Sequence, residues 1–412
     1  MKLEVLSASE LNSTILALFI LLFSAFVCGR LFEAIKAPKV IGEIFGGFIL
    51  GASGLYYFMP ELALGLFKSY EQEGKVLNIF YHLGLIFLMF VAGFNTRLNY
   101  EKANLKIISY LFVGATFLPI LAGYFFIDFF KEAYLGAAND EFSFALVFLI
   151  AIAVTSIPVI SKIFFDLGLI KTRFASIVLS TSTIQDLFLW IVLNVAINSA
   201  LNKEFSFLSN VITVFLTIFL FFGIQFIVKF LSQFKFKIRH DDFIILSISA
   251  LFLVIFLLSL AHINPMYSAF LMGFLVKNLS TSFNIKSVSD FSFSFFIPVY
   301  FALIGIQLNI VNDFSFTYFL LFCLLACVFE FVGCYIMLLS LKMSNLARLS
   351  FSVSMNARGG PGIVLASVAY YYKIINVNFF TSLILTTLLS SMIAGYFLRF
   401  VKAKNIKCFE EL

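Results

Sequence analysis

Residues 350–369 read SFSVSMNARGGPGIVLASVA, a segment long enough to cross a membrane but poorly suited to forming one continuous helix. Glycine and proline are the weakest formers of a helix interior, and Gly359–Gly362 (GGPG) lies at the centre of the segment. Asn356 and Arg358 add polar groups at the same depth. We therefore expect the helix to break here, which a membrane tolerates only where protein or a watery cavity covers the unwound backbone.

A second segment with an interruption lies at residues 149–168, LIAIAVTSIPVISKIFFDLG. Pro158 lies near its middle, where proline removes a backbone donor and frees a carbonyl one turn earlier. Thr155 and Ser156 precede it and can satisfy that polarity. Taken alone, this segment is explained equally well by an ordinary proline kink.

The chain as a whole has the composition of an integral membrane protein. Of its 412 residues, 62% are hydrophobic and 12% charged, whereas about 25% are charged in a soluble domain. A helix of about 20 apolar residues spans the roughly 30 Å hydrocarbon layer. Hydropathy predicts 13 such spans, at residues 13–35, 40–57, 77–96, 105–130, 143–166, 174–200, 207–232, 242–262, 264–280, 289–311, 315–341, 347–371 and 378–401.

The basic residues orient these spans. Twenty of the 28 Lys and Arg residues fall in one alternating set of loops and six in the other. The positive-inside rule then predicts an outside N-terminus and a cytoplasmic C-terminus in the plasma (inner) membrane. The net charge of +6 follows from this loop bias, so no nucleic-acid partner is expected.

The two interrupted segments are the fifth and twelfth spans, seven apart, so they cross the membrane in opposite directions. This spacing predicts an inverted repeat, with residues 1–202 (spans 1–6) matching 240–412 (spans 8–13) around a linking span in 203–239. No soluble regulatory domain is expected. Interrupted helices at corresponding positions of two repeats indicate the midplane binding site of a transporter.

One carboxylate lies deep in the sixth span, in TSTIQDLFLW (181–190). Asp186 is the only charged residue between Phe174 and Asn202, and it lies about 20 Å along a helix from Arg173. Such a residue costs about 2.5–3.5 kcal/mol to insert and usually marks an ion or proton pathway. We expect it to bind a cation or a proton, with Gln185 and the hydroxyls of residues 181–183 as partners. The alternative is a carboxylate that only hydrogen-bonds to neighbouring spans.

Four further charges lie within predicted spans. Glu330, in the middle of the eleventh span, either joins the ion site or pairs with Arg358. Arg358 is expected to neutralise half-helix carbonyls or a buried carboxylate, because a substrate cation would be repelled by it. Lys162 either supports the site or extends to the inner face. Glu43 is either an end-of-helix residue facing water or a supporting charge; the glycines of residues 42–51 predict close helix packing.

Five stretches, in this order, resemble the monovalent cation:proton antiporter-2 family, which includes Kef-type and sodium/proton exchangers. The resemblance implies the sodium/proton antiporter fold, all-α with two crossing discontinuous helices, and places Asp186 on the family's cation/proton aspartate. It also implies a core bundle (spans 4–6 and 11–13) that moves against a dimer-forming panel (spans 1–3 and 8–10). The stretches are PKVIGEIFGGFILGASGL (38–55), GLIFLMFVAGFNT (84–96), AVTSIPVISKIFFDLGLI (153–170), TSTIQDLFLWIVL (181–193) and NARGGPGIVLA (356–366).

Two departures from the family pattern bear on stoichiometry. The electrogenic branch carries two adjacent acids where this chain has Gln185 and Asp186, a pair similar to the Kef-type, potassium-linked pattern. That branch also often carries a lysine in the eleventh span, at a position that resembles Glu330 here. Both departures favour electroneutral exchange.

The sequence thus predicts a membrane transporter and no enzyme: a secondary antiporter exchanging Na⁺ or K⁺ for protons by alternating access, embedded in the lipid bilayer as a homodimer without a cofactor. The alternative is a proton-coupled transporter of a small organic solute on the same fold. A channel or a membrane enzyme is disfavoured, because neither a filter-like repeat nor a catalytic constellation is visible. The predicted ion-binding residues are Asp186 (the metal-ion ligand), Gln185, Thr155, Ser156 and Asn356; the supporting charges are Glu330, Arg358, Lys162 and Glu43; and the broken-helix residues are Pro158, Gly359, Gly360 and Pro361.

Overall fold

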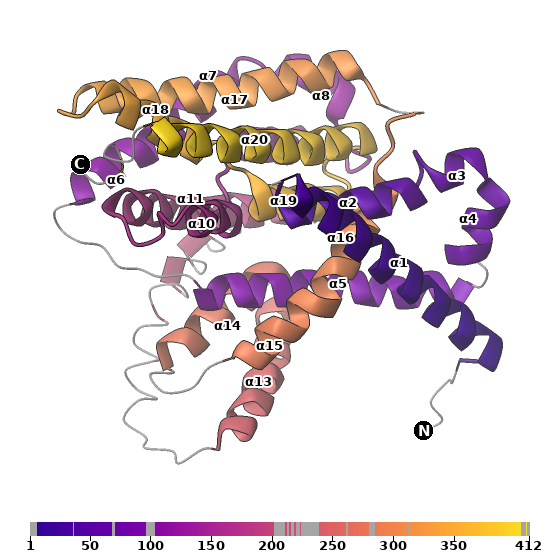
Figure 1. The fold of residues 1–412 in the computed structure, drawn as a ribbon. Coiled ribbons are helices and arrows are strands. Elements are labelled where there is room, and N and C mark those ends of the chain that lie inside the picture. The colour runs from indigo at the N-terminus through magenta and orange to yellow at the C-terminus, as the bar shows by residue number, and fades with distance from the viewer. Residues whose placement is uncertain are drawn as a thin grey trace. The chain divides into compact units, whose positions relative to one another are not determined.

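In the computed structural model of the protein, the described residues form helices joined by turns and loops, with one isolated β-bridge and no strand among them (Figure 1). The chain divides into two compact units, each built from two stretches of sequence. Unit 1 comprises Met1–Asn95 and Phe219–Asn312, and unit 2 comprises Thr96–Ile218 and Asp313–Leu412. The described residues are 6–35, 37–67, 71–95, 104–201, 239–260, 263–279, 285–311 and 314–404, with Phe409 and single positions between 211 and 223.

Unit 1 is held together by close helix contacts at glycines. A Cβ atom added to Gly42 would lie 2.3 Å from the carbonyl oxygen of Cys28 in α1, and one on Gly47 would lie 1.8 Å from that of Ala302 in α16. The close packing predicted for residues 42–51 is therefore present, with α2 pressed between α1 and α16. The helices of unit 1 are α1 (Ala8–Ala34), α2 (Lys39–Leu50), α3 (Leu55–Phe58), α4 (Pro60–Phe67), α5 (Glu71–Asn95), α13 (His240–Leu260), α14 (Pro265–Leu279), α15 (Lys286–Phe291), the π-helix η3 (Ser292–Phe296) and α16 (Ile297–Gln307).

Unit 2 contains both interrupted spans, each as a pair of short helices. The fifth span forms α9 (Glu141–Ile152) and α10 (Ile157–Asp166), and the twelfth forms α18 (Asn345–Met355) and α19 (Gly359–Tyr371). The other elements of the unit are α6 (Leu105–Phe112), the π-helix η2 (Val113–Phe117), α7 (Leu118–Tyr124), α8 (Ile127–Tyr134), α11 (Arg173–Leu201), α17 (Phe316–Leu339) and α20 (Val377–Lys404).

Nine helices among the described residues are long and apolar enough to cross a membrane, so the predicted count of 13 spans is not confirmed. The difference has physical reasons. The two interrupted spans consist of half-helices that are each too short, and α14 has 15 residues. The seventh predicted span, 207–232, lies almost wholly outside the described residues.

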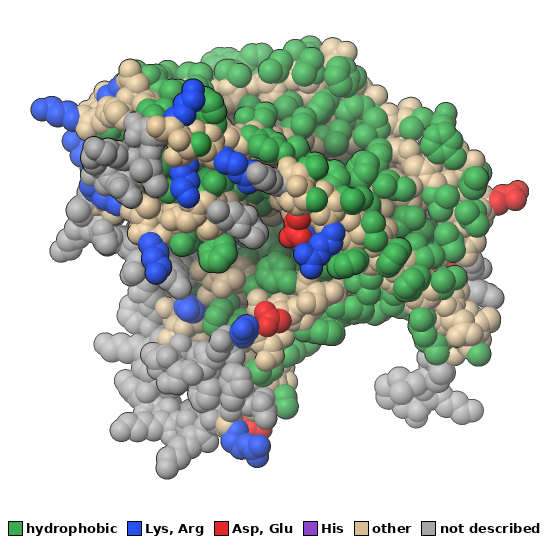
Figure 2. All heavy atoms as spheres, viewed as in Figure 1, with side chains coloured by type: hydrophobic (Ala, Val, Ile, Leu, Met, Phe, Trp, Pro, Cys, Tyr) green, Lys and Arg blue, Asp and Glu red, His purple; other side chains and the backbone are tan. Residues whose placement is uncertain are grey.

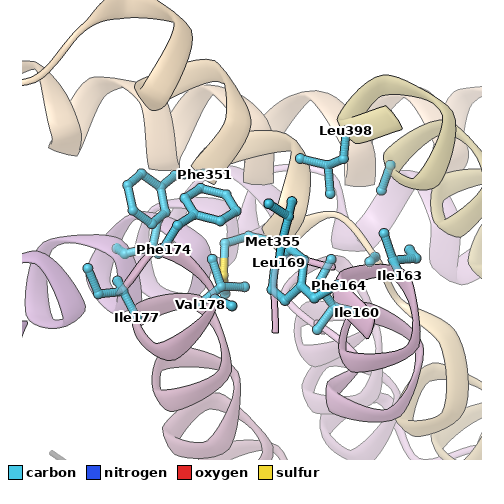
Figure 3. Packing of buried hydrophobic residues seen from close by; sticks show 14 of the residues in the cluster. Ile160, Ile163, Phe164, Leu169, Phe174, Ile177, Val178, Phe351, Met355 and Leu398 are labelled. Atoms are coloured by element: carbon cyan, nitrogen blue, oxygen red, sulfur yellow. The ribbon is translucent and has the colours of Figure 1, made fainter. Parts of the chain in front are cut away.

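A buried apolar cluster joins two of the half-helices, α10 and α18, to the long helices of unit 2 (Figure 3). Phe174 of α11 packs against Phe351 of α18 with ring centroids 4.5 Å apart, and Phe164 of α10 meets Phe174 at 5.6 Å. Met355, the last residue of α18, belongs to the same cluster and is fully buried. The break in the twelfth span is therefore anchored directly in the core, which fixes where its unwound backbone lies.

Candidate functional site

The first break begins where α9 ends at Ile152, and non-helical backbone leads to α10 at Ile157. The Ser156 hydroxyl caps α10 by accepting from the backbone N–H of Val159 at 3.3 Å. Pro158 lies in the first turn of α10, where a backbone N–H has no partner within the helix. It therefore lies at the start of the second half-helix, and of the two alternatives offered by the sequence the described backbone shows a broken helix and not a simple kink.

The second break begins after Met355, and α19 starts at Gly359. Gly359 has a φ of +26°, a value that residues with a Cβ rarely adopt. A Cβ on Gly359 would lie 2.1 Å from Cγ2 of Val159, so the second break also passes directly against the first turn of α10. The Gly359 N–H donates to Oγ of Ser391 in α20 at 3.2 Å.

The two unwound segments are hydrogen-bonded to each other where they cross. The Ser156 N–H donates to the carbonyl of Ala357 at 2.6 Å, and the Thr155 hydroxyl donates to that of Met355 at 2.5 Å. The Ser156 hydroxyl accepts from the Gly360 N–H at 3.1 Å in addition to its bond with Val159. One serine thus caps the N-termini of both half-helices, which removes two unsatisfied donors from the membrane interior.

Arg358 and Glu330 form a fully buried ion pair beside this crossing. Nη2 of Arg358 lies 2.7 Å from Oε2 of Glu330, and their side chains are 1% and 0% exposed. The same nitrogen donates to the carbonyl of Ile152, the last residue of α9, at 3.0 Å. Arg358 therefore neutralises a carboxylate and the negative end of a half-helix together, the two roles that the sequence offered for it.

Asp186 on α11 is buried, and its Oδ1 atom has no hydrogen-bond partner among the described residues. The neighbouring threonines do not supply one: the hydroxyls of Thr181 and Thr183 donate to carbonyls of their own helix, those of Ile177 and Leu179. Hydroxyl side chains in helices commonly bond the carbonyl four residues earlier. The buried carboxylate is thus left with an oxygen that can accept a proton or a cation.

Gln185 connects two separate irregularities of the backbone. Its Nε2 donates to the carbonyl of Ala115 in η2 at 3.1 Å and to that of Ala153 in the first break at 2.9 Å. Because both partners are acceptors, the amide nitrogen must face them and Oε1 must point away. Oε1 has no partner in the described part of the chain. A short π-helical segment such as η2 is frequent at functional sites.

Asn356 is arranged in the same way. Its Nδ2 donates to the carbonyl of Ser352 at 3.4 Å, and its buried Oδ1 lacks a described partner. The five predicted ion-binding residues therefore divide into two kinds. Asp186, Gln185 and Asn356 each keep a side-chain oxygen available, whereas Thr155 and Ser156 use their hydroxyls to hold the crossing.

The other two predicted supporting charges are Glu43 and Lys162. Glu43 lies in unit 1, where it is 4% exposed and pairs with Nζ of Lys39 at 3.1 Å, so the alternative of a water-facing residue is not what this unit shows, and its role as a supporting charge stays a prediction. Packing against the glycine contacts of α2 accounts for its low exposure. Lys162 lies on α10, and its side chain is outside the described residues.

Three residues of unit 2 belong to the site and were missed from the sequence. Thr116 on η2 follows Ala115 and has a buried hydroxyl without a described partner. Ser391 caps Gly359, and Cys327 accepts from Nη1 of Arg358 at 3.3 Å. The hydroxyl-rich stretch TTLLSS (386–391) was the one available signal for Ser391.

The buried side-chain oxygens without described partners belong to a carboxylate, to amides and to hydroxyls, and oxygens of these kinds are the ligands of hard cations. No group of three or more His, Cys, Asp or Glu residues that could hold a metal ion occurs among the residues the structure describes. Unit 2 therefore contains a buried carboxylate and two amide oxygens without described partners, together with a crossing stabilised by an internal ion pair.

Comparison with known proteins identifies the family. The pattern of the family described as sodium/hydrogen exchanger, transmembrane, matches residues 21–404. The chain belongs to this family. The sodium/hydrogen exchangers are membrane transporters, in agreement with the family and the class that the sequence predicted.

Individual relatives of this exchanger are distant. The Na(+)/H(+) antiporter NhaS4 of Synechocystis sp. is 25% identical over 386 residues, which cover 89% of this chain and 92% of that protein. The K(+)/H(+) antiporter 1 of Saccharomyces cerevisiae is 30% identical over 174 residues, which cover 40% of this chain and 19% of that protein.

A solved structure confirms the fold that the sequence predicted for the exchanger. The sodium proton antiporter MjNhaP1 of Methanocaldococcus jannaschii, determined at pH 8, superposes with a TM-score of 0.62 at 16% identity, covering 96% of this chain and 97% of that chain.

Proposed function

We propose that this exchanger is a secondary antiporter in which a monovalent cation, Na⁺ or K⁺, and protons compete for Asp186. The observation that carries the proposal is the buried Oδ1 atom of Asp186, which lacks a hydrogen-bond partner in the described part of the chain. An unpaired carboxylate inside a membrane is costly unless a proton or a cation neutralises it. Membership of the sodium/hydrogen exchanger family supports this exchange.

The neutral oxygens of Gln185 and Asn356 complete the proposed cation site. Both amides are tied through their nitrogens to backbone carbonyls, so their oxygens are held in place before a cation arrives. Preorganised oxygens reduce the cost of replacing the hydration shell of the ion. Thr155 and Ser156 act through the crossing that positions this group.

The charges of the site support electroneutral exchange. Gln185 stands where a second acid would add a charge, and Glu330 is already neutralised by Arg358 at 2.7 Å. Asp186 is then the one carboxylate that changes its ligand during a transport cycle. One cation bound in place of one proton moves no net charge.

The division into two units supports transport by alternating access. Unit 2 contains both broken helices and Asp186, and its two stretches correspond to spans 4–6 and 11–13. We propose that unit 2 moves against unit 1, that unit 1 forms a homodimer, and that the N-terminus lies outside and the C-terminus in the cytoplasm. The inverted repeat of residues 1–202 and 240–412 remains part of the same proposal.

The test is a flux assay in proteoliposomes loaded with a pH-sensitive dye. A gradient of Na⁺ or K⁺ should drive proton movement in the wild type, and Asp186→Asn should abolish it. Asp128→Asn is the matched control, because the Asp128 carboxylate is 93% exposed and lies outside the site. Undiminished flux in the Asp186 variant would refute the proposal. Proton movement that follows an organic solute and no alkali cation would favour the alternative transporter.

A further inference from the structure

The two ends of the unit 2 helix bundle differ in charge. One end, where α6, α11 and α18 begin and α10, α17 and α20 end, carries eight basic side chains and one acidic residue, Asp166, within the described segments. Among the described residues, the opposite end carries four acidic residues and two basic ones, Lys131 and Lys373. We call the first the basic end; Figure 2 shows Lys and Arg gathered there. Its basic residues are Lys106, Lys171, Arg173, Lys342, Arg348, Arg399, Lys402 and Lys404.

Hydrogen bonds between neighbouring helix ends show that the basic end is one surface. Nε of Arg173 at the start of α11 donates to Oδ1 of Asn104, just before α6, at 2.7 Å. Nε of Arg348 in α18 donates to the carbonyl of Leu338 in α17 at 3.2 Å. Lys402 of α20 donates to the carbonyl of Leu167, just after α10. Residues far apart in the sequence therefore share this surface.

Among the described residues, no ion pair joins an exposed lysine of the basic end to a carboxylate. The described ion pairs of unit 2 join Lys131 to Asp128 and Glu141 at the opposite end, and Arg358 to Glu330 in the interior. The lysines at positions 106, 171, 342 and 404 are all exposed, and none has a described acidic partner. An uncompensated cluster of this kind on a membrane protein attracts anions.

Large apolar side chains lie in the sequence next to these lysines and are exposed as well. Leu105 precedes Lys106 and is 44% exposed, and Ile170 precedes Lys171 and is 36% exposed. Phe400, over whose ring Nζ of Lys404 lies at 4.3 Å, is 56% exposed. Adjacent apolar and basic side chains are typical of the boundary between acyl chains and lipid headgroups. A site for a soluble acidic protein would lie in water, where the exposed apolar side chains would have no partner.

We propose that the basic end of unit 2 is a binding surface for the headgroups of anionic phospholipids. The phosphates contact the exposed lysines, and the acyl chains lie against the neighbouring apolar side chains. This inference rests on unit 2 alone and is independent of which ion the exchanger carries.

The test measures the lipid that stays bound to the full-length protein. The purified protein is mixed in detergent micelles with equal amounts of phosphatidylglycerol and phosphatidylcholine, passed over a size-exclusion column, and its bound lipids are quantified by mass spectrometry. The wild type should retain phosphatidylglycerol preferentially. The preference should disappear in 1 M salt, where the Debye length falls to about 3 Å.

The double variant Lys171→Gln/Lys342→Gln should weaken phosphatidylglycerol binding at least about tenfold, because each basic residue near an anionic surface contributes several-fold to the affinity. Both lysines are exposed and make no described contact that a substitution would break. The matched control, Lys131→Gln/Lys373→Gln at the opposite end, should keep the wild-type preference. Equal loss in both variants, or no preference in the wild type, would overturn the proposal. A wild type that binds inorganic polyphosphate but retains the two lipids equally would overturn it in favour of a soluble polyanion.

Discussion

The crossing of the two broken helices depends on the absence of a side chain at Gly359. A Cβ there would lie 2.1 Å from Cγ2 of Val159 and 2.5 Å from the Ser156 hydroxyl, and the backbone φ is +26°. The left-handed backbone costs a residue with a Cβ about 1–2 kcal/mol, and overpacking costs about 1–3 kcal/mol. We therefore expect Gly359→Ala to destabilise the folded protein by about 2–5 kcal/mol.

A matched substitution separates this effect from the general effect of alanine in a helix. A Cβ on Gly395 in α20 would meet its nearest atom, Cδ1 of Ile163, at 3.7 Å, an ordinary contact. Gly395→Ala should leave stability unchanged or raise it by about 0.5–1 kcal/mol, since glycine is the poorer helix former.

The assay is the thermal unfolding midpoint (Tm) of each purified variant in the same detergent. Gly359→Ala should lower Tm by about 2–6 °C for a chain of this length, whereas Gly395→Ala should not lower it. Since the Ser156 hydroxyl caps both half-helices, cation flux per folded molecule should fall as well. Equal Tm values for the two variants would refute the reasoning that the crossing requires glycine.

Three further predictions concern charges. Glu330→Gln should lower Tm, because it leaves Arg358 buried without its counter-ion at a cost of about 3–5 kcal/mol. The pH profile of transport should stay unchanged in this variant. A shifted profile would instead place Glu330 in the ion site. Asp140, before α9, has its pKa raised by burial but lowered further by hydrogen bonds from Ser143, Ser199 and the Phe142 N–H, so the net pKa lies below its ordinary value. Its contribution to stability is therefore complete above about pH 4 and is lost as the pH falls further; Tm measured against pH should show this loss in the wild type and not in Asp140→Asn. Cation-driven proton flux should be insensitive to an imposed voltage, and a flux that changes with voltage would contradict electroneutral exchange.

The positions of the helices could be predicted from sequence because a membrane requires long apolar runs. Predicted bounds such as 174–200 and 378–401 lie close to α11 (Arg173–Leu201) and α20 (Val377–Lys404). The breaks were visible for a related reason: GGPG and a buried arginine conflict with a continuous helix at 356–362. The predicted number of spans could not be confirmed in the same way, because each half-helix and α14 is by itself too short to count as a membrane-crossing helix.

The partners of the site residues could not be predicted, since they depend on contacts between distant segments. Gln185 bonds to carbonyls 70 and 32 residues away, at Ala115 and Ala153, and the first of these lies in the π-helix η2, which no sequence pattern indicated. The sequence left open whether Glu330 pairs with Arg358 or joins the ion site; the structure shows the pair with Arg358 and, in addition, a hydrogen bond from the Thr155 hydroxyl to Oε1 of Glu330 at 3.1 Å. The threonines beside Asp186 were expected to bond to it, but their hydroxyls bond to carbonyls of the preceding turn, as hydroxyl side chains in helices commonly do.

The central claim is that a proton and a cation compete for one carboxylate, and cation binding to the purified exchanger tests it most directly. Isothermal titration of Na⁺ and K⁺ at a series of pH values gives the apparent Kd and the number of protons released. The account predicts one proton released per cation bound and a Kd that rises about tenfold per pH unit in the acidic limb. Both effects should be absent in Asp186→Asn. A Kd that is independent of pH, or an Asp186→Asn variant that binds the cation as tightly as the wild type, would contradict the account.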